Sequence, residues 1–375
     1  MPPVTVMVKP VSGACNMRCR YCFYADEMAR RAHAVLPAMT LDMLETLVRR
    51  VMVYAEGEAN FVFQGGEPTL AGVDFYRHLV RLQRQYSRPT VRISNAIQTN
   101  GLALSGEMIA FLAEQRFLVG VSLDGCAAVH DSMRRDTAGQ GTFRRVCGNV
   151  RRLREAGAEV NILCVVNGET AAHAREVLDA LEPLGYLQLI PCLDGLDGTP
   201  GPSPLTDEAY GAFLQAAFDR YERAFRQGRL LSIRYFDNLL GMLLGIPPES
   251  CSMQGICQAG FVVESTGDVY PCDFYALDAW RMGNLQDMSL RQLARSAAGE
   301  RFRREAAPVP EACRVCAAYD LCRNGCRRER DPLTGQYRFC AGMRAFLLGN
   351  RDRMEAMARA LAERGLQHGQ IAIRF

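Results

Sequence analysis

The distribution of cysteines constrains the fold of this chain more than any other feature. Of its fifteen cysteines, three lie close together near the start and eight lie between residues 251 and 340. The stretch GACNMRCRYCFY places the first three at Cys15, Cys19 and Cys22. The first residues lack the order of a signal peptide, and no apolar run reaches the roughly 18 residues of a membrane span. We therefore expect a cytoplasmic protein, in which such cysteines serve a metal, a cluster or redox chemistry rather than disulfides.

Composition sets the broad class. A chain of 375 residues that is 49% hydrophobic can bury a sizeable core and has the length of about two domains. Its net charge of +3 is too mild for an electrostatic nucleic-acid binder. The four scattered cysteines Cys126, Cys147, Cys164 and Cys192 stand in apolar contexts, and we interpret them as small buried hydrophobic residues.

The first 240 residues alternate strand-like and helix-like patterns. The predicted strands are Val4–Lys9, Asn60–Gln64, Val91–Gln98, Phe117–Leu123, Val160–Val166 and Leu187–Leu193. One predicted helix begins after a capping Thr40 and another after a capping Thr142. This alternation predicts an α/β fold of parallel β/α units, either closed into a barrel or open.

Polar and glycine-rich pieces follow the predicted strands, where ligands of such folds collect. They are the cysteine loop at 15–22, Gly65-Gly66-Glu67-Pro68, Gln98-Thr99-Asn100-Gly101 and Ser122-Leu123-Asp124-Gly125. Each piece alone is also ordinary turn chemistry. Four of them on one predicted edge indicate a site.

Three thiols at this spacing are one short of a closed zinc site, which normally takes four ligands. A [4Fe–4S] cluster held by three thiolates keeps one iron open to a chelating small molecule. Together with Tyr21 before the third cysteine and the downstream Gly65-Gly66-Glu67, the loop resembles the radical S-adenosylmethionine enzymes. A zinc knuckle completed by a distant ligand is the alternative.

This resemblance implies a partial (β/α)6 barrel and a first cluster whose open iron binds S-adenosylmethionine. It implies that a 5′-deoxyadenosyl radical from that cofactor abstracts a hydrogen atom, while the protein positions the reactants. Gly66 would allow close backbone approach to the methionine amino group. Arg134 would meet the methionine carboxylate, although from sequence alone it could be a solvated surface arginine. The residues that the resemblance assigns to the cofactor are Tyr21, Gly65, Gly66, Glu67, Gln98, Ser122, Arg134 and Leu193.

The eight later cysteines follow the spacings C-x5-C-x14-C and C-x2-C-x5-C-x3-C-x13-C. They resemble the SPASM extension, which holds two auxiliary [4Fe–4S] clusters. The resemblance assigns Cys251, Cys257, Cys272 and Cys326 to one cluster and Cys313, Cys316, Cys322 and Cys340 to the other. Fully ligated clusters would carry electrons and not bind substrate. A pair of zinc ribbons is the alternative, which the x5 and x3 spacings fit poorly.

Longer segments narrow the resemblance to the anaerobic sulfatase-maturating enzymes, nearly end to end. They include Phe63-Gln-Gly-Gly-Glu-Pro-Thr-Leu-Ala-Gly72, Ser232-Ile-Arg-Tyr-Phe-Asp237 and Tyr270-Pro-Cys-Asp-Phe-Tyr275. Those enzymes oxidise a cysteine or serine in a Cys/Ser-x-Pro/Ala-x-Arg segment of a sulfatase to Cα-formylglycine. This resemblance implies an oxidoreductase that acts on a sulfatase polypeptide under anaerobic conditions.

Such a reaction needs a base for the thiol or hydroxyl proton, and Asp273 matches the position of the proposed base in the family. A carboxylate in a dry pocket would have a raised proton affinity, which suits that role; a structural aspartate is the alternative. The resemblance also places Tyr24, Gln64 and Asp237 near the peptide, with core packing as the alternative for Tyr24. Cys126 departs from the proline that relatives usually carry there.

We expect a radical S-adenosylmethionine domain over 1–235, a SPASM domain over 236–340 and a C-terminal helix over 341–375. The expected partners are an unfolded or nascent sulfatase segment and a reductant such as flavodoxin or ferredoxin, with no nucleic acid and no membrane, for a monomer. A SPASM maturase that forms thioether or carbon–carbon crosslinks is the runner-up, although the motif at residue 15 leaves no room for a preceding peptide-recognition domain. A plain iron–sulfur electron carrier has no use for an open iron.

Overall fold

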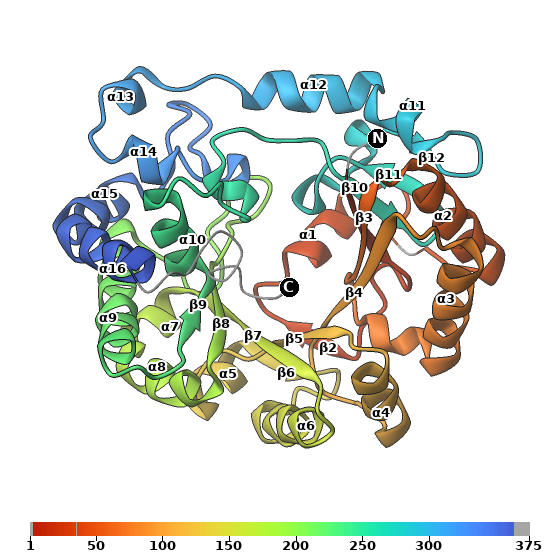
Figure 1. The fold of residues 1–375 in the computed structure, drawn as a ribbon, viewed down its shortest axis with the longest axis horizontal. Helices are drawn as coiled ribbons and strands as arrows, with labels where there is room; N and C mark the ends of the chain where they lie inside the picture. The colour runs from red at the N-terminus through yellow and green to blue at the C-terminus, as the bar shows by residue number, and fades with distance from the viewer. Residues whose placement is uncertain (1–2, 35, 364–375) are drawn as a thin grey trace. The chain divides into compact units, whose positions relative to one another are not determined.

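The computed structural model describes residues 3–34 and 36–363, and the chain divides into two compact units. Unit 1 consists of Met1–Ser122, Met133–Asn161 and Gln258–Arg304; unit 2 consists of Leu123–Ser132, Ile162–Cys257 and Glu305–Phe375. Both contain parallel strands connected through helices (Figure 1), as the alternating sequence pattern predicts. The compact units do not coincide with the expected domain boundaries at 235 and 340, which stay a prediction because a compact unit can combine pieces of several domains.

Unit 1 is built on a sheet with the strand order β12-β11-β10-β1-β3-β4-β5. Its strands are β1 (Val4–Lys9), β3 (Gly57–Phe63), β4 (Val91–Thr99), β5 (Leu118–Ser122), β10 (Phe261–Glu264), β11 (Asp268–Tyr270) and β12 (Gly283–Asn284). Neighbours from β10 to β5 run parallel, and β11 and β12 continue the sheet in antiparallel pairs. The predicted β1 has the observed bounds, whereas β3 begins earlier than expected, at Gly57.

Helices cover this sheet with apolar faces. Those of unit 1 are α1 (Phe23–Ala29), α2 (Leu41–Tyr54), α3 (Val73–Tyr86), α4 (Gly106–Glu114), α6 (Phe143–Glu155), α11 (Leu290–Ala294) and most of α12 (Ala297–Ala306). Thr40 caps α2 as predicted, since its Oγ1 accepts from the Met43 amide at 3.2 Å. Thr142 occupies the N-cap position of α6 as predicted, but its hydroxyl donates to the Arg134 carbonyl at 2.8 Å and makes no capping hydrogen bond to the helix.

A short antiparallel ribbon stands apart from the sheet of unit 1. It pairs β2 (Met17–Cys19) with β6 (Arg134–Asp136). Since β2 contains Cys19, the ribbon fixes part of the three-cysteine loop against a segment more than a hundred residues away in sequence.

Unit 2 contains the parallel strands β7 (Glu159–Val166), β8 (Tyr186–Pro191) and β9 (Ser232–Ile233), of which β7 begins within unit 1. Its helices are α5 (Ala127–Met133), α7 (Gly168–Ala172), α8 (Ala174–Leu181), α9 (Asp207–Arg226), α10 (Arg234–Leu243), α13 (Glu311–Arg314), α14 (Tyr319–Cys322), α15 (Cys340–Gly349) and α16 (Arg351–Glu363). Of the four scattered cysteines, Cys164 and Cys192 are buried as expected, but Cys126 and Cys147 are partly exposed. No helix within residues 3–34 and 36–363 has both the length and the apolar character of a membrane span.

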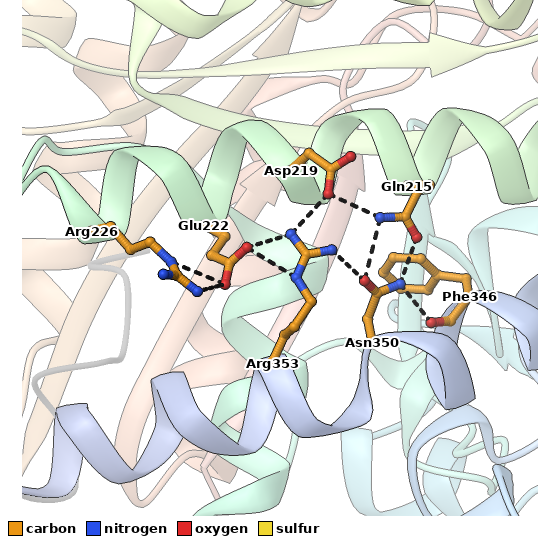
Figure 2. Close-up of polar contacts among 7 residues, drawn as sticks. All are labelled: Gln215, Asp219, Glu222, Arg226, Phe346, Asn350 and Arg353. Atoms are coloured by element: carbon orange, nitrogen blue, oxygen red, sulfur yellow. Dashed lines mark hydrogen bonds and ion pairs between the residues drawn. The ribbon is translucent and has the colours of Figure 1, made fainter.

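The segment after residue 340, expected to be one helix, forms two helices that meet at Asn350. Asn350 is 2% exposed, and its amide exchanges hydrogen bonds with Gln215 on α9 and accepts from Arg353 on α16. Arg353 also contacts Asp219 and Glu222 on α9 (Figure 2). These polar contacts fix the position of α15 and α16 on α9.

We predict that Asn350→Ala lowers the free energy of unfolding by about 1–3 kcal/mol, because it removes a buried amide whose hydrogen bonds join the partly buried Gln215 and Arg353 side chains. Urea denaturation measures this change. Arg226→Ala is the matched control in the same network: its side chain is 73% exposed, so we expect a loss below about 1 kcal/mol. Equal losses for the two variants would contradict a buried, position-fixing role for Asn350.

Candidate functional site

The three-cysteine loop follows β1 and lies at the surface of unit 1. Cys22 is exposed, and Cys15 and Cys19 are partly exposed. The Cys15 sulfur accepts from the Met17 amide at 3.4 Å and from the Asn100 side-chain amide at 3.6 Å. Such N–H donors stabilise a thiolate, which is the form that ligates iron.

The Gly-Gly-Glu segment after β3 pairs with the backbone of this loop. The Gly66 amide donates to Ser12 at 2.7 Å, and the Glu67 amide donates to Ala14 at 2.8 Å. A Cβ on Gly66 would lie 2.1 Å from the Ala14 carbonyl oxygen, so only glycine permits this approach. The second glycine therefore sets how closely the segment lies against the cysteine loop.

Glu67 joins three segments at this edge of the sheet. Its carboxylate is 1% exposed and accepts from the Thr69 amide and hydroxyl, the Thr99 hydroxyl and the Asn100 amide, at 2.6–3.1 Å. Burial raises the pKa of Glu67, and these donors lower it. The carboxylate is thus occupied by protein donors, and the Gly66 and Glu67 amides are engaged by Ser12 and Ala14.

The other residues predicted to bind the cofactor fall in both units. In unit 1, Gln98 and Ser122 lie at the carboxyl ends of the neighbouring strands β4 and β5. Arg134 is buried and donates to the Tyr21 hydroxyl at 2.9 Å, so it is not the solvated surface arginine of the alternative. Leu193 belongs to unit 2, just after β8.

Asp273 lies in unit 1 and is held by two side chains. The buried Lys9 ammonium contacts one carboxylate oxygen at 2.5 Å, and the Gln64 side-chain amide donates to the other. The Asp273 side chain is 13% exposed and that of Lys9 is fully buried. The surroundings of Asp273 are therefore enclosed, as expected, but they include a cation that the sequence analysis did not identify.

Tyr24 is also more constrained than the sequence indicates. It is buried on α1, and its hydroxyl donates to Glu264 and lies 3.2 Å from an Arg31 nitrogen. The Lys9 ammonium lies 3.8 Å from the centre of its ring, which is a cation–π contact. Tyr24 thus lies in a buried cluster of charged side chains, and its contact with peptide stays a prediction.

A fifth charged group, Glu27, completes this buried cluster. Burial raises the pKa of Glu27 to about 8, and the charge of Asp273 acts in the same direction. The cluster thus combines two basic side chains, Lys9 and Arg31, with three acidic ones, of which Glu27 is protonated near neutral pH. This balance satisfies the requirement that buried charges be paired.

The cysteine loop and Asp273 are brought together by their next neighbours in sequence. Phe23, directly after Cys22, and Phe274, directly after Asp273, pack edge to face with ring centres 4.9 Å apart. A three-thiol loop, a glycine-lined segment and a fixed carboxylate therefore occupy the same region of unit 1. This combination can bind a metal cluster, hold a small ligand and accept a proton.

The later cysteines of unit 2 fall into two electrostatic groups. The thiol of Cys326 is influenced by Cys251 and Cys257, and that of Cys322 by Cys313, Cys316 and Cys340. Burial raises the pKa of Cys322 to about 11. Cys272 belongs to unit 1.

No three His, Cys, Asp or Glu side chains of the described chain converge on a single-ion site. A cubane cluster differs from such a site, because each of its thiolate ligands binds a different iron.

Asp207 fixes the position of Cys340. Its carboxylate accepts from the Ala341 amide at 2.8 Å and the Gly342 amide at 2.6 Å, the first amides of α15 after Cys340. A side chain on Gly342 would collide with the Asp207 backbone, so α15 lies directly on the start of α9. The arrangement satisfies amides at the helix start that have no partner within the helix.

Asp237, predicted to contact peptide, lies in unit 2 with both carboxylate oxygens engaged. One accepts from the Tyr221 hydroxyl at 2.6 Å and the other from the Ser232 hydroxyl at 2.8 Å. Burial raises the pKa of Asp237 to about 7, and the two hydroxyl bonds lower it. Its contact with peptide stays a prediction.

Sequence reasoning missed Lys9, Glu264, Arg31 and Glu27. Two of them carried a usable pattern: Lys9 ends the apolar strand VTVMVK, and Glu264 ends the apolar strand FVVE. The two residues are register partners on β1 and β10. A charged residue at the end of a buried strand marks a candidate site in parallel sheets, whereas Arg31 and Glu27 carry no such mark.

Comparisons with known proteins agree with this geometry. The Radical SAM superfamily profile matches residues 10–181, and the SPASM profile, an iron-sulfur cluster-binding domain, matches residues 254–317. The cysteine-type anaerobic sulfatase-maturating enzyme of Clostridium novyi is 38% identical over 97% of this chain and 100% of its own length. The serine-type enzyme of Klebsiella aerogenes is 30% identical over 92% of this chain and 84% of its own.

A solved structure described as native anSMEcpe with bound AdoMet and Cp18Cys peptide has a TM-score of 0.91 to this one. It is 38% identical in sequence, and the superposition covers 96% of this chain and 100% of that chain. The α/β fold class predicted from the sequence, with radical SAM and SPASM domains, is confirmed by these matches.

We predict that Lys9→Met lowers the free energy of unfolding by about 3–5 kcal/mol, because it leaves the Asp273 carboxylate without its buried cation. In urea denaturation, the double variant Lys9→Met/Asp273→Asn should lose less than the sum of the two single variants. Arg30→Ala removes the exposed pair with Asp26 and should cost less than about 1 kcal/mol. Strict additivity of the Lys9 and Asp273 changes would show that the pair is not coupled.

The raised pKa of Asp237 predicts how the stability of the folded protein depends on pH. Its pKa is about 7 when folded, against about 3.9 when unfolded, so the protonated form favours the folded state. This stabilisation is complete below about pH 4 and disappears as the pH rises through about 7. Asp237→Asn should therefore gain stability relative to the parent protein over that range, by up to roughly 4 kcal/mol. Urea denaturation of both proteins across the range measures the difference, and a constant difference would refute the shift.

Proposed function

Because the chain belongs to the anaerobic sulfatase-maturating enzymes of the radical SAM superfamily, we propose that it oxidises a sulfatase cysteine to Cα-formylglycine. The target is a cysteine, or a serine, in a Cys/Ser-x-Pro/Ala-x-Arg segment of an unfolded or nascent sulfatase. Greater identity to the cysteine-type relative than to the serine-type one, 38% against 30%, supports cysteine as the preferred residue. Eleven cysteines committed to clusters require a reducing compartment, which supports a cytoplasmic location.

The residues present fit the first cluster and S-adenosylmethionine. Cys15, Cys19 and Cys22 would hold three irons, and the N–H donors on the Cys15 sulfur favour the thiolate that such ligation needs. When bound, the cluster and S-adenosylmethionine would supply the one-electron chemistry that removes hydrogen from the substrate carbon. The backbone of Gly65-Gly66-Glu67, with Tyr21, Gln98, Ser122, Arg134 and Leu193, would orient the cofactor.

Asp273 is the residue we propose as the base. The observation that carries the proposal is its position: Lys9 and Gln64 fix its carboxylate, and the Phe23–Phe274 contact holds it beside the three-cysteine loop. A carboxylate held in this way can take the substrate thiol proton without first reorganising its surroundings. Gln64 and Tyr24 would contact the peptide at its edge, and Asp237 remains a candidate in unit 2.

Two auxiliary [4Fe–4S] clusters would complete the site. Cys313, Cys316, Cys322 and Cys340 would hold one, and Cys251, Cys257, Cys272 and Cys326 the other. The grouping of the thiols within unit 2 supports this division. Four thiolates per cluster leave no iron for substrate, so the auxiliary clusters would accept the electron that the oxidation releases. A reductant such as flavodoxin or ferredoxin would supply the first cluster, and the enzyme would work as a monomer.

The runner-up, a SPASM maturase that forms thioether or carbon–carbon crosslinks, finds less support. The relatives of Clostridium novyi and Klebsiella aerogenes, matched over 100% and 84% of their own length, are sulfatase-maturating enzymes of the cysteine and serine types. Anaerobic incubation with a sulfatase peptide and S-adenosylmethionine, followed by mass spectrometry, tests the choice. Formylglycine at the target cysteine supports the proposal, and an intramolecular crosslink or an unmodified peptide contradicts it.

We predict that Asp273→Asn uncouples the two products. Loss of the proton acceptor should reduce formylglycine formation by roughly 10²–10⁴-fold, while cleavage of the cofactor to 5′-deoxyadenosine persists. Both are quantified in one anaerobic reaction. Because Lys9 is buried beside Asp273, stability is measured in parallel, and Lys9→Met serves as the control that disturbs the pair but keeps the carboxylate. A near-normal formylglycine yield from Asp273→Asn would remove Asp273 from the chemistry.

The metal content provides a separate prediction. A fully loaded protein should contain about twelve irons, four for each of three cubanes. Replacing Cys15, Cys19 and Cys22 together with alanine should remove one third of that iron and spare the rest. Iron and zinc analysis of the purified protein is the measurement. Unchanged iron, or zinc in its place, would overturn the assignment of the first cluster.

A further inference from the structure

Two arginines hold the backbone on both sides of Leu193, the residue of unit 2 that the family resemblance assigns to the cofactor. The Arg338 guanidinium donates from one nitrogen to the Cys192 carbonyl and from another to the Asp194 carboxylate. The Arg328 guanidinium donates to the Asp194 carbonyl at 2.6 Å. Both residues that flank Leu193 are therefore fixed by side chains that lie 134 to 146 positions later in the sequence.

The contact of Arg338 depends on the shape of its guanidinium. A planar guanidinium presents its N–H groups as a rigid fork, so one side chain can bind two acceptors at a fixed separation. Here the two acceptors belong to Cys192 and Asp194, so the fork bridges Leu193 and restricts the backbone between them. A lysine at this position would offer a single ammonium nitrogen in place of the fork.

Leu193 stands where a ligand can reach it. It follows β8, at the carboxyl end of a parallel strand, and it is partly exposed. The buried Cys192 before it makes the last sheet bond of the segment, from its amide to the Val166 carbonyl at 2.8 Å. In the described structure, residues 195–201 contain three glycines and belong to no helix or strand. The two arginines thus supply contacts at the point where those of the sheet end.

Both arginines belong to a hairpin between two proposed cluster ligands, Cys326 and Cys340. The Arg338 amide donates to the Glu329 carbonyl at 2.9 Å. The buried Asn324 side chain binds two backbone groups of the returning arm, at 2.8 and 2.9 Å. These bonds do not use the side chains of the two arginines, so we expect the hairpin to form without their guanidinium groups.

We propose that Arg338 and Arg328 are positioning residues that keep Leu193 in the conformation that binds S-adenosylmethionine. The proposal rests on the proposed function, because the family resemblance assigns Leu193 to that cofactor. Neither arginine contacts the reacting atoms; each acts through the backbone that flanks Leu193. The hairpin between two cluster ligands then also contributes to the affinity for the cofactor.

Loss of the fork should weaken cofactor binding without changing the chemical step. The apparent dissociation constant rises as the fraction of molecules in the binding conformation falls, so a segment that holds this conformation about a tenth of the time would bind roughly 10-fold more weakly. Saturating S-adenosylmethionine selects that conformation again, so kcat should stay within about twofold of the parent value.

The experiment measures the Kd of S-adenosylmethionine for the cluster-loaded full-length protein by anaerobic equilibrium dialysis. KM for the cofactor and kcat for formylglycine formation are measured beside it, as are iron content and stability in urea. The variants are Arg338→Met, Arg338→Lys, Asp194→Ala and Arg338→Met/Asp194→Ala.

Arg220→Met is the matched control, since its side chain is buried to a similar degree, 16% exposed against 19% for Arg338. Arg220 also pairs with carboxylates of unit 2, Asp179 at 2.7 Å and Glu182 at 3.1 Å. Those residues precede β8, whereas the segment that Arg338 holds follows it.

We expect Arg338→Met to raise Kd and KM by roughly 10-fold at the parent kcat and iron content, and Arg220→Met to keep the parent Kd. Arg338→Lys should recover part of the loss, because its ammonium can still pair with Asp194. The double variant should bind little more weakly than Arg338→Met alone, because both changes break one shared contact. If Arg338→Met loses iron, Asp194→Ala breaks the same contact from the other side and carries the same expectation.

Equal Kd values for the parent protein and Arg338→Met, with iron retained, would overturn the positioning role. A fall in kcat at unchanged KM would overturn it too, as would strictly additive effects of the Arg338 and Asp194 changes or an equal rise in Kd for Arg220→Met. Failure of the proposed function looks different: a parent protein that binds no S-adenosylmethionine or forms no formylglycine contradicts the function itself. A parent that does both, and that Arg338→Met matches, contradicts only the role of the two arginines.

Discussion

The ion pair between Lys9 and Asp273 is the contact on which the arrangement of unit 1 depends. It joins residues 264 positions apart, and a fully buried ammonium is tolerable only when a carboxylate meets it. Lys9 ends β1, and Asp273 follows β11, which extends the sheet beyond β10. The charge requirement of one lysine thus determines where the Pro-Cys-Asp segment must lie.

The same requirement organises the surrounding side chains. The Lys9 ammonium lies over the Tyr24 ring. Glu264 accepts hydrogen bonds from the Tyr24 hydroxyl and from the Arg31 guanidinium, and Glu27 stays protonated near neutral pH. A carboxylate proposed to accept a proton is thereby held on both oxygens without a direct contact to another ionised acid. Gln64 and Lys9 position it, and the Phe23–Phe274 contact relates it to the cysteine loop.

Close backbone contacts at glycines and the packing of helices position the segments that carry the cysteines. Gly66 allows one segment to lie against the first loop, and Glu67 ties that segment to the end of β4. In unit 2, the contact between Gly342 and Asp207 holds α15, which begins at Cys340, against the start of α9. In each case packed backbone, and not the cysteine itself, determines where a proposed cluster ligand lies.

Sequence alone determined much of this protein. Strand and helix periodicity is local, so the parallel β/α organisation and the exact bounds of β1 could be read from it. The cysteine spacings likewise identified the iron–sulfur character of both ends of the chain. Only the tertiary structure decided that β10 pairs with β1, that Glu67 is occupied by protein donors and that Lys9 meets Asp273. Those contacts join segments distant in sequence, and their energies come from burial and charge pairing, which a residue acquires only when the chain is folded.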